Sequence, residues 1–109
     1  MTRQRPPAWA VLEQALRHKR PALVHYHGQD RLVCPHALGW KNGRPRALVY
    51  QSGGTTSQGG LPTDPRQRWR SLLIDEVEQA TISIGAWATA DNYTSASNCI
   101  DDLYMAVDG

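Results

Sequence analysis

Four side chains that could bind a metal ion lie close together near the start of the chain. They are His25, His27, Cys34 and His36. Zinc takes four such nitrogen or sulfur ligands in a tetrahedron, but this spacing matches no standard zinc pattern. A hairpin with its turn at residues 28–30 would also split the four ligands between two faces. We therefore predict that the protein holds no metal, and we expect no cofactor.

The same hairpin predicts which face is buried. A three-residue turn pairs His27 with Arg31 and separates the flanking residues into two sets. One face is expected to be largely apolar and carries Val24, Tyr26, Leu32, Cys34 and His36. The opposite face is expected to carry His25, His27, Arg31 and Val33. Cys34 is then a small buried residue, as free cysteines often are.

Cys34 and His36 are the best candidates for a nucleophile and its base. In a strand, however, side chains two residues apart are separated by about 6.6–7 Å. That separation exceeds the hydrogen-bond distance that a cysteine–histidine pair requires. The adjacent carboxylates Asp75-Glu76 point in different directions in a strand. We predict that the protein is not an enzyme.

Three arginines alternate around a tryptophan at residues 66–70. In a strand, Arg68 and Arg70 share one face, while Trp69 faces the core. Two guanidinium groups on one face suit a phosphate or a carboxylate. Arg31 and Arg46 on neighbouring strands would extend this basic surface. The alternative is that these arginines pair with the acids that follow in the sequence.

Charge is distributed unevenly along the chain. All twelve Lys and Arg residues lie between Arg3 and Arg70 with three acids, and the other seven acids follow Arg70. The front part thus carries +9 and the remainder −7, for a net charge of +2. A basic face would attract phosphates or nucleic acid. Ion pairs between the two parts and charge-steered docking or self-association are the alternatives.

The elements that must position these residues begin with a helix, expected over residues 8–20. Pro6 and Pro7 precede it, and proline loses no hydrogen bond at a first helical turn. Apolar residues recur at helical spacing from Trp9, and Pro21 ends the pattern.

Residues 22–85 predict about five short antiparallel strands. Gly28–Asp30 and Asn42-Gly43 are turn sequences, and Arg46–Gln51 forms the third strand. Ser52–Gln67 is rich in Gly, Ser, Thr and Pro and indicates a long loop. Short strands with tight connections favour a small five-stranded SH3-like or Sm-like barrel over an open sheet.

Residues 86–109 are expected to be irregular and to end in a short helix. Asn98 can cap that helix, and Ile100, Leu103 and Val107 supply an apolar stripe. The expected fold class is therefore mainly β with flanking helices (α+β). A length of 109 residues fits one domain over residues 1–109, with a flexible start at 1–7.

The expected location is the cytoplasm. The N-terminus lacks the apolar segment of a secretory signal, and no apolar run reaches the ~20 residues that cross a bilayer. Both Cys34 and Cys99 are then expected to be free thiols.

The stretch YHGQDRLVCPHALGWKNGRPRALVYQSGG, followed by WRSLLIDEVEQATI, resembles the WYL domain, in a short stand-alone form. The similarity covers roughly Leu12 to Ile84, and the naming triplet is replaced by Pro45-Arg46-Ala47. It implies an Sm-like barrel that acts as a sensor in bacterial transcriptional regulation, usually after a DNA-binding helix-turn-helix. A single N-terminal helix cannot supply that motif here.

The resemblance also implies a pocket that binds nucleotides or nucleic acid through basic and aromatic residues. Six residues stand at positions that resemble this pocket, namely Tyr26, Arg31, His36, Tyr50, Gln51 and Arg70. The arginine pattern adds Arg68 to the expected site. The predicted function is a non-enzymatic module that binds a nucleotide or single-stranded nucleic acid. Arg31 and Arg70 would contact phosphate, and Tyr26 or Tyr50 would stack on a base.

The alternative is a protein-interaction module that docks a separate regulator or defence protein, or a second copy. Its docking segment would be the loop Ser52–Gln67 or the segment from Trp87 to Tyr93.

Overall fold

The computed structural model describes residues 5–54, 60–91 and 100–107, and it is mainly β. One α-helix precedes six strands, and two short 3-10 turns flank β4. The elements are α1 (Pro7–His18), β1 (Ala22–Tyr26), β2 (Gln29–Lys41), β3 (Arg44–Gly54), η1 (Pro65–Gln67), β4 (Trp69–Leu73), η2 (Ile74–Glu76), β5 (Val77–Ile82) and β6 (Asp102–Ala106).

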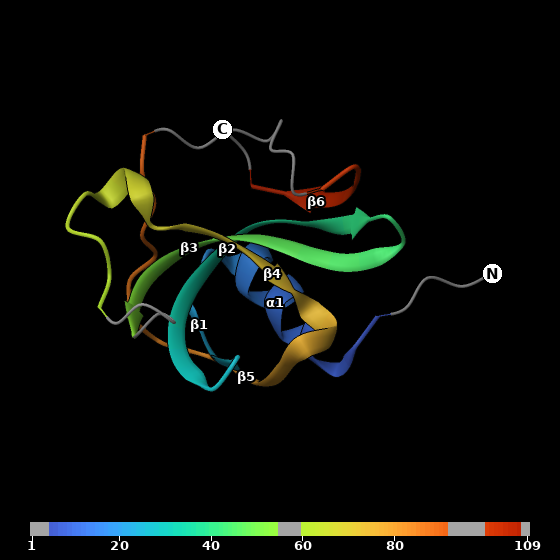
Figure 1. Ribbon diagram of the computed structural model, residues 1–109, viewed down its shortest axis with the longest axis horizontal. Coiled ribbons are helices and arrows are strands. Elements are labelled where there is room, and N and C mark those ends of the chain that lie inside the picture. The colour runs from blue at the N-terminus through green and yellow to red at the C-terminus, as the bar shows by residue number, and fades with distance from the viewer. Residues whose placement is uncertain (1–4, 55–59, 92–99, 108–109) are drawn as a thin grey trace.

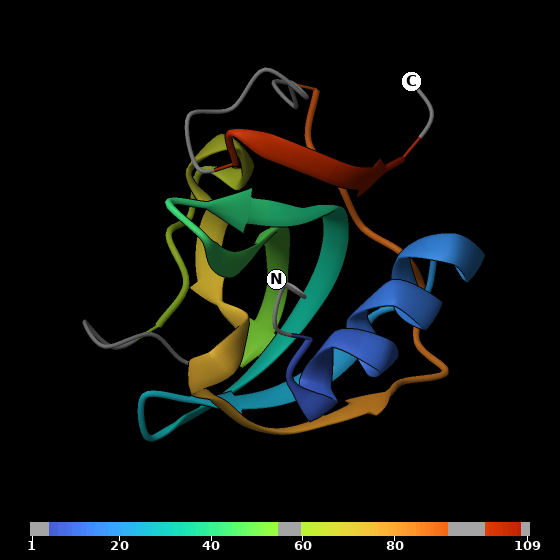
Figure 2. The same ribbon diagram turned by 90° about the vertical axis from the view of Figure 1, so that its right-hand side faces the viewer.

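All six strands belong to one antiparallel sheet. Its order is β4-β3-β2-β1-β5, and β6 pairs with the far half of β2. The sheet curls strongly, and α1 lies across the side that the curl leaves open (Figures 1 and 2). The sheet is open in the part of the chain described, since β4 and β5 both lie at its ends. It has six strands rather than the expected five.

The helix prediction is confirmed, with α1 at Pro7–His18. Its apolar stripe packs into the core, where Leu12 is fully buried and Trp9 and Leu16 nearly so. Lys19 adopts a left-handed conformation, and the Arg20 amide donates to the Ala15 carbonyl to close the helix end. Among the described residues, no helix has the length and apolarity needed to span a membrane.

The first hairpin turns at His27-Gly28 rather than at Gly28–Asp30. Both turn residues have positive φ, 51° and 76°, as a two-residue hairpin turn requires. Tyr26 then pairs with Gln29, and Val24 pairs with Arg31. The predicted faces are therefore wrong, because Arg31 shares the core-bearing face with Val24 and Tyr26.

Cys34 is fully buried, as predicted, although it lies on the opposite face from the core cluster. Irregular residues 83–91 cover that face, and the Ala88 amide donates to the Cys34 sulfur over 3.3 Å. Cys34 is a free thiol, whereas Cys99 lies outside the described residues.

The second hairpin confirms the Asn42-Gly43 turn, with φ of 52° and 79° and Lys41 paired with Arg44. The third strand is longer than predicted and continues to Gly54. The expected loop therefore begins later, and it contains the short 3-10 turn Pro65–Gln67.

The predicted C-terminal helix is wrong, because β6 occupies residues 102–106. Leu38 pairs with Met105, and Gly39 pairs with Leu103. A side chain at Gly39 would overlap the Asp102 backbone and the Ile100 side chain, so glycine permits the close approach of β6. The proposed cap, Asn98, lies outside the described residues.

Candidate anion-binding site

Arg31 is a buried cation on the core-bearing face of β2. Only 6% of its surface is exposed, and its guanidinium carbon lies 5.3 Å from the centre of the Tyr26 ring. The Tyr26 hydroxyl in turn accepts a hydrogen bond from the Leu73 amide at 3.1 Å. The buried Nε–H of Arg31 has no hydrogen-bond partner among the described residues.

Arg70 reaches the same face from β4. It pairs with Val49, whose side chain belongs to the core, and residues paired across strands share a face. Its Nη1 donates to the carbonyls of Gln67 and Trp69, both at 2.9 Å. Burial lowers the pKa of Arg31, the neighbouring Tyr26 opposes that shift, and the like charge of Arg70 lowers it further. The two arginines therefore share one face of the sheet, and their charges repel each other.

No carboxylate in the described ranges pairs with Arg31 or Arg70. Two other arginines of the front part differ. Arg44 binds Asp75 at 2.9 Å and Glu76 at 3.1 Å, and Arg66 binds Asp91 at 2.8 Å. The acidic part of the chain thus neutralises Arg44 and Arg66, and it leaves the Arg31–Arg70 pair uncompensated.

The end of β3 forms the wall beside Arg31. Gln51 is fully buried, shares a face with its partner Val33, and donates from Nε2 to the Gly53 carbonyl at 3.1 Å. Gly54 pairs with Arg31 at a φ of 83°, and a side chain there would overlap the Arg31 backbone. Glycine at this position brings main chain directly against the arginine.

His27 belongs to this region, although the sequence reasoning left it out of the site. Its ring stacks on Tyr26 with a centroid distance of 3.9 Å and an angle of 17°. It thereby covers the face of Tyr26 that was expected to receive a base. The His27 side chain is 51% exposed, and its Nε2 lies 2.6 Å from Glu76. The dipeptide His27-Gly28 could have indicated a two-residue turn in the sequence, and that turn places His27 beside Tyr26.

We call Tyr26, His27, Arg31, Gln51 and Arg70 the arginine site.

Two of the predicted site residues, His36 and Tyr50, lie on the other face of the sheet. His36 is 1% exposed and packs 4.7 Å from both the Trp69 and Trp87 rings. Tyr50 meets Trp69 edge-on at 5.1 Å. Trp69 therefore does not face the core, because its neighbour Arg70 does. We call His36, Tyr50, Trp69, Trp87 and Thr89 the histidine cluster.

Both ring nitrogens of His36 have partners. Nδ1 lies 2.7 Å from the Cys34 carbonyl, and Nε2 lies 2.9 Å from the Thr89 hydroxyl. Burial lowers the pKa of His36, although the Cys34 carbonyl opposes that shift. The imidazole is thus held neutral within a packed cluster.

The Cys34 thiol and the His36 imidazole do not form a nucleophile–base pair. The histidine bonds to the Cys34 carbonyl rather than to its thiol, and burial raises the pKa of that thiol. A buried thiol with a raised pKa is a poor nucleophile.

Arg68 and Arg46 do not join Arg31. Arg68 precedes β4, and its Nε donates to the Pro62 carbonyl at 2.8 Å. Arg46 donates to the Ser71 hydroxyl at 3.1 Å. Of the four arginines in the predicted basic surface, only Arg31 and Arg70 therefore lie on the same face.

The suspected zinc ligands separate as well. His25 shares a face of the sheet with Cys34 but lies 2.8 Å from Asp30, and His27 at the turn binds Glu76. His36 instead bonds to the Cys34 carbonyl and to the Thr89 hydroxyl. In the described ranges, no three His, Cys, Asp or Glu residues are placed to hold a metal ion.

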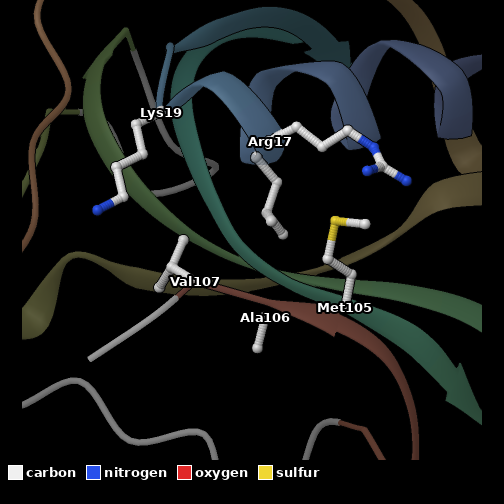
Figure 3. A pocket seen from close by; sticks show the side chains of 6 residues that line it. Arg17, Lys19, Met105, Ala106 and Val107 are labelled. Atoms are coloured by element: carbon white, nitrogen blue, oxygen red, sulfur yellow. The ribbon is translucent and has the colours of Figure 1, made fainter.

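A separate cavity of about 170 Å³ opens between the C-terminal half of α1 and β6 (Figure 3). Met105 and Val107 point toward the helix, whereas Ala106 points away. The side chains of Arg17 and Lys19 lie at its rim. None of the predicted site residues lines this cavity.

Compared with family models, curated proteins and solved structures, the chain matches none of them.

Proposed function

We propose that the protein is a non-enzymatic, WYL-like module that binds a nucleotide or single-stranded nucleic acid at the arginine site. Its role would be that of a sensor, in which ligand binding is passed to a separate regulator.

The fold part of this proposal is an SH3-like or Sm-like barrel. An N-terminal helix comes first, five strands follow in the order β4-β3-β2-β1-β5, and a 3-10 turn connects β4 to β5. Strong curling with a helix over the open side is typical of small partly closed barrels. In this interpretation β6 is an addition to the barrel.

One observation carries the proposal, namely that the buried Arg31 and the half-buried Arg70 share a face of the sheet without a counter-ion among the described residues. Burying a charge is costly unless it is paired and hydrogen-bonded. The lowered pKa of Arg31 reflects that cost. An anion that bonds both Arg31 and Arg70 would relieve it, and guanidinium groups favour the bidentate oxygens of phosphate.

The neighbouring groups favour a nucleotide over a bare phosphate. Tyr26 is covered by His27 and lies against Arg31, so the ring left to stack on a base is the exposed His27. We therefore assign phosphate recognition to Arg31 and Arg70, and base stacking to His27.

Thermal unfolding with a ligand panel tests this proposal, because a ligand of the folded state raises the melting temperature. The probes are inorganic phosphate, nucleoside triphosphates and a short oligothymidylate. We expect the nucleotide or the oligonucleotide to raise the melting temperature more than phosphate does. Arg31→Met should abolish that increase, and Arg44→Met, whose arginine is already paired, should retain it. An equal increase in both variants would contradict the proposal.

A protein-interaction module is the second candidate, supported by exposed apolar residues. Leu23 on β1 and Ile82 on β5 are about half exposed, and Ile84 is 93% exposed. They lie near β5, an end strand of the sheet, where unpaired backbone invites a partner. The proposed docking residue Trp87 instead packs on His36. Size-exclusion profiles with and without oligonucleotide distinguish the two candidates.

A further inference from the structure

Arg5 lies among three aromatic rings, away from the residues of the arginine site. Its guanidinium carbon is 4.7 Å from the centre of the Tyr104 ring, 5.5 Å from Trp9 and 6.0 Å from Trp40. Each distance lies within the range of a cation–π interaction. A single cation over three rings is the arrangement by which aromatic cages bind cationic ligands.

The three rings come from three different elements and hold one another in place. Trp9 on α1 stacks on Trp40 of β2 at 4.9 Å. Tyr104 on β6 meets Trp9 and Trp40 edge-on, at 5.4 Å and 6.1 Å. Both tryptophans are at least 95% buried. The rings are therefore positioned by the core and do not depend on Arg5 for their arrangement.

A carboxylate adjoins the rings. Trp9 donates from Nε1 to Glu13 at 3.1 Å, and the Tyr104 hydroxyl donates to Glu13 at 3.4 Å. Hydrogen bonding to Arg17 lowers the pKa of Glu13, so this carboxyl is ionised at neutral pH. The ion pair with Arg17 at 2.8 Å already compensates this charge, so the role of Glu13 is to orient the Trp9 and Tyr104 rings through its two hydrogen bonds.

Arg5 can leave this place without dismantling the fold. It is exposed and precedes α1, which begins at Pro7. A guanidinium group from another molecule could then take the place of Arg5 and make the same contacts with the three rings.

We propose that Trp9, Trp40, Tyr104 and Glu13 form a receptor for an arginine side chain of a partner protein, with Arg5 as its internal occupant. A guanidinium is favoured over an ammonium because it is planar and weakly hydrated, and it stacks on aromatic rings. The cavity of Figure 3 lies farther along α1, beside Met105 and Val107, and none of the three rings lines it. The partner segment is thus defined by one arginine side chain that takes the place of Arg5.

The four tryptophan indole N–H signals in a nuclear magnetic resonance spectrum test the proposal. N-acetyl-arginine amide is titrated into Arg5→Ala, where the receptor is vacant. We expect saturable shifts of the Trp9 and Trp40 signals, and no saturable shift of Trp69 or Trp87. The wild-type protein should need several-fold more ligand, because Arg5 competes from the same chain. N-acetyl-lysine amide should bind more weakly.

The matched control is Arg20→Ala, which removes an exposed arginine outside the receptor and should titrate like the wild type. Adding Tyr104→Leu to Arg5→Ala should weaken arginine binding, because the nearest ring is lost. The proposal is overturned if Arg5→Ala shows no saturable shift, or if Tyr104→Leu leaves the affinity unchanged. If Arg5→Ala does not fold, N-acetyl-arginine amide is titrated into the wild-type protein instead. Equal shifts of all four tryptophan indole signals would then refute the receptor.

Discussion

The arginine site and the histidine cluster lie on opposite faces of the same strands, and both bury groups that can carry charge. Arg31 and His36 are separated by five positions in β2, and their exposed fractions are 6% and 1%. Both ring nitrogens of His36 have partners, and two tryptophan rings enclose it. Arg31 instead keeps a buried Nε–H without a partner among the described residues and shares its face of the sheet with a second cation, Arg70.

The difference shows that burial alone does not mark a functional residue. A buried polar group that is fully hydrogen-bonded stabilises and specifies the fold. A buried charge without a counter-ion destabilises the fold until a ligand neutralises it. We therefore propose that the histidine cluster stabilises the fold and that the arginine site binds a ligand. Each prediction below tests this division of roles.

The largest expected effect comes from His36→Ala. This change removes a buried ring, leaves the Thr89 hydroxyl without its partner and opens a cavity between Trp69 and Trp87. We expect the free energy of unfolding to fall by about 2–4 kcal/mol. Urea denaturation measures it. Nucleotide binding by the remaining folded protein should be unchanged, and a loss of binding greater than the loss of folded protein would contradict the division.

The second effect is a dependence of stability on pH. The pKa of His36 is lower in the folded protein than its usual 6.5, so the unfolded chain takes up the proton first. Stability from this group is complete above about pH 6.5 and declines as the pH falls from there toward the folded pKa. Urea denaturation at several pH values measures this slope. His36→Gln should flatten it.

His25 provides the control for that measurement, because its shift has the opposite sign. Hydrogen bonding to Asp30 raises the pKa of His25, so its contribution is present at low pH and declines as the pH rises through the folded pKa. This histidine is solvated, and its effect should be small. An acid-side decline that survives His36→Gln and disappears in His25→Asn would refute the assignment to His36.

A smaller effect is expected from Arg31→Met in the absence of ligand. The change removes a buried charge and its unsatisfied Nε–H, and it retains much of the side-chain volume. We expect the free energy of unfolding to rise by about 1 kcal/mol. Chemical denaturation in a buffer free of phosphate measures it. A decrease of similar size would mean that Arg31 stabilises the fold and is not held in place for a ligand.

The smallest effect is expected from Arg44→Ala. Its ion pairs with Asp75 and Glu76 are exposed, and such pairs contribute about 0–1 kcal/mol. Their contribution should decrease further as salt is added. Denaturation at low and high salt measures it. A loss above 2 kcal/mol would show that this pairing, and not the histidine cluster, dominates polar stabilisation.

The parts of the fold that follow from local sequence were predictable. Pro6-Pro7 and the apolar spacing after Trp9 gave the helix, and Asn42-Gly43 gave the second hairpin. The first hairpin failed because His27, a non-glycine residue, adopts a positive φ of 51°. That shift of the turn moved Arg31 to the core-bearing face.

The C-terminal strand could not be inferred from spacing. Leu103 and Val107 fit a helical stripe, but the long β2 offers its far half as a pairing edge, and the sheet overrides the helical pattern. The choice among arginines also depended on tertiary structure. Sequence predicted that the acids could neutralise some of them, whereas only the fold determines that Arg44 and Arg66 are paired.

The salt dependence of oligothymidylate binding, compared between the wild type and Arg70→Ala, tests the arginine site most directly. Each phosphate contact with a single strand contributes a slope of about −0.7 to a plot of log K against log salt. We predict that Arg70→Ala weakens binding about tenfold or more and makes the slope shallower by about one contact. An affinity and a slope that both equal those of the wild type would contradict the site.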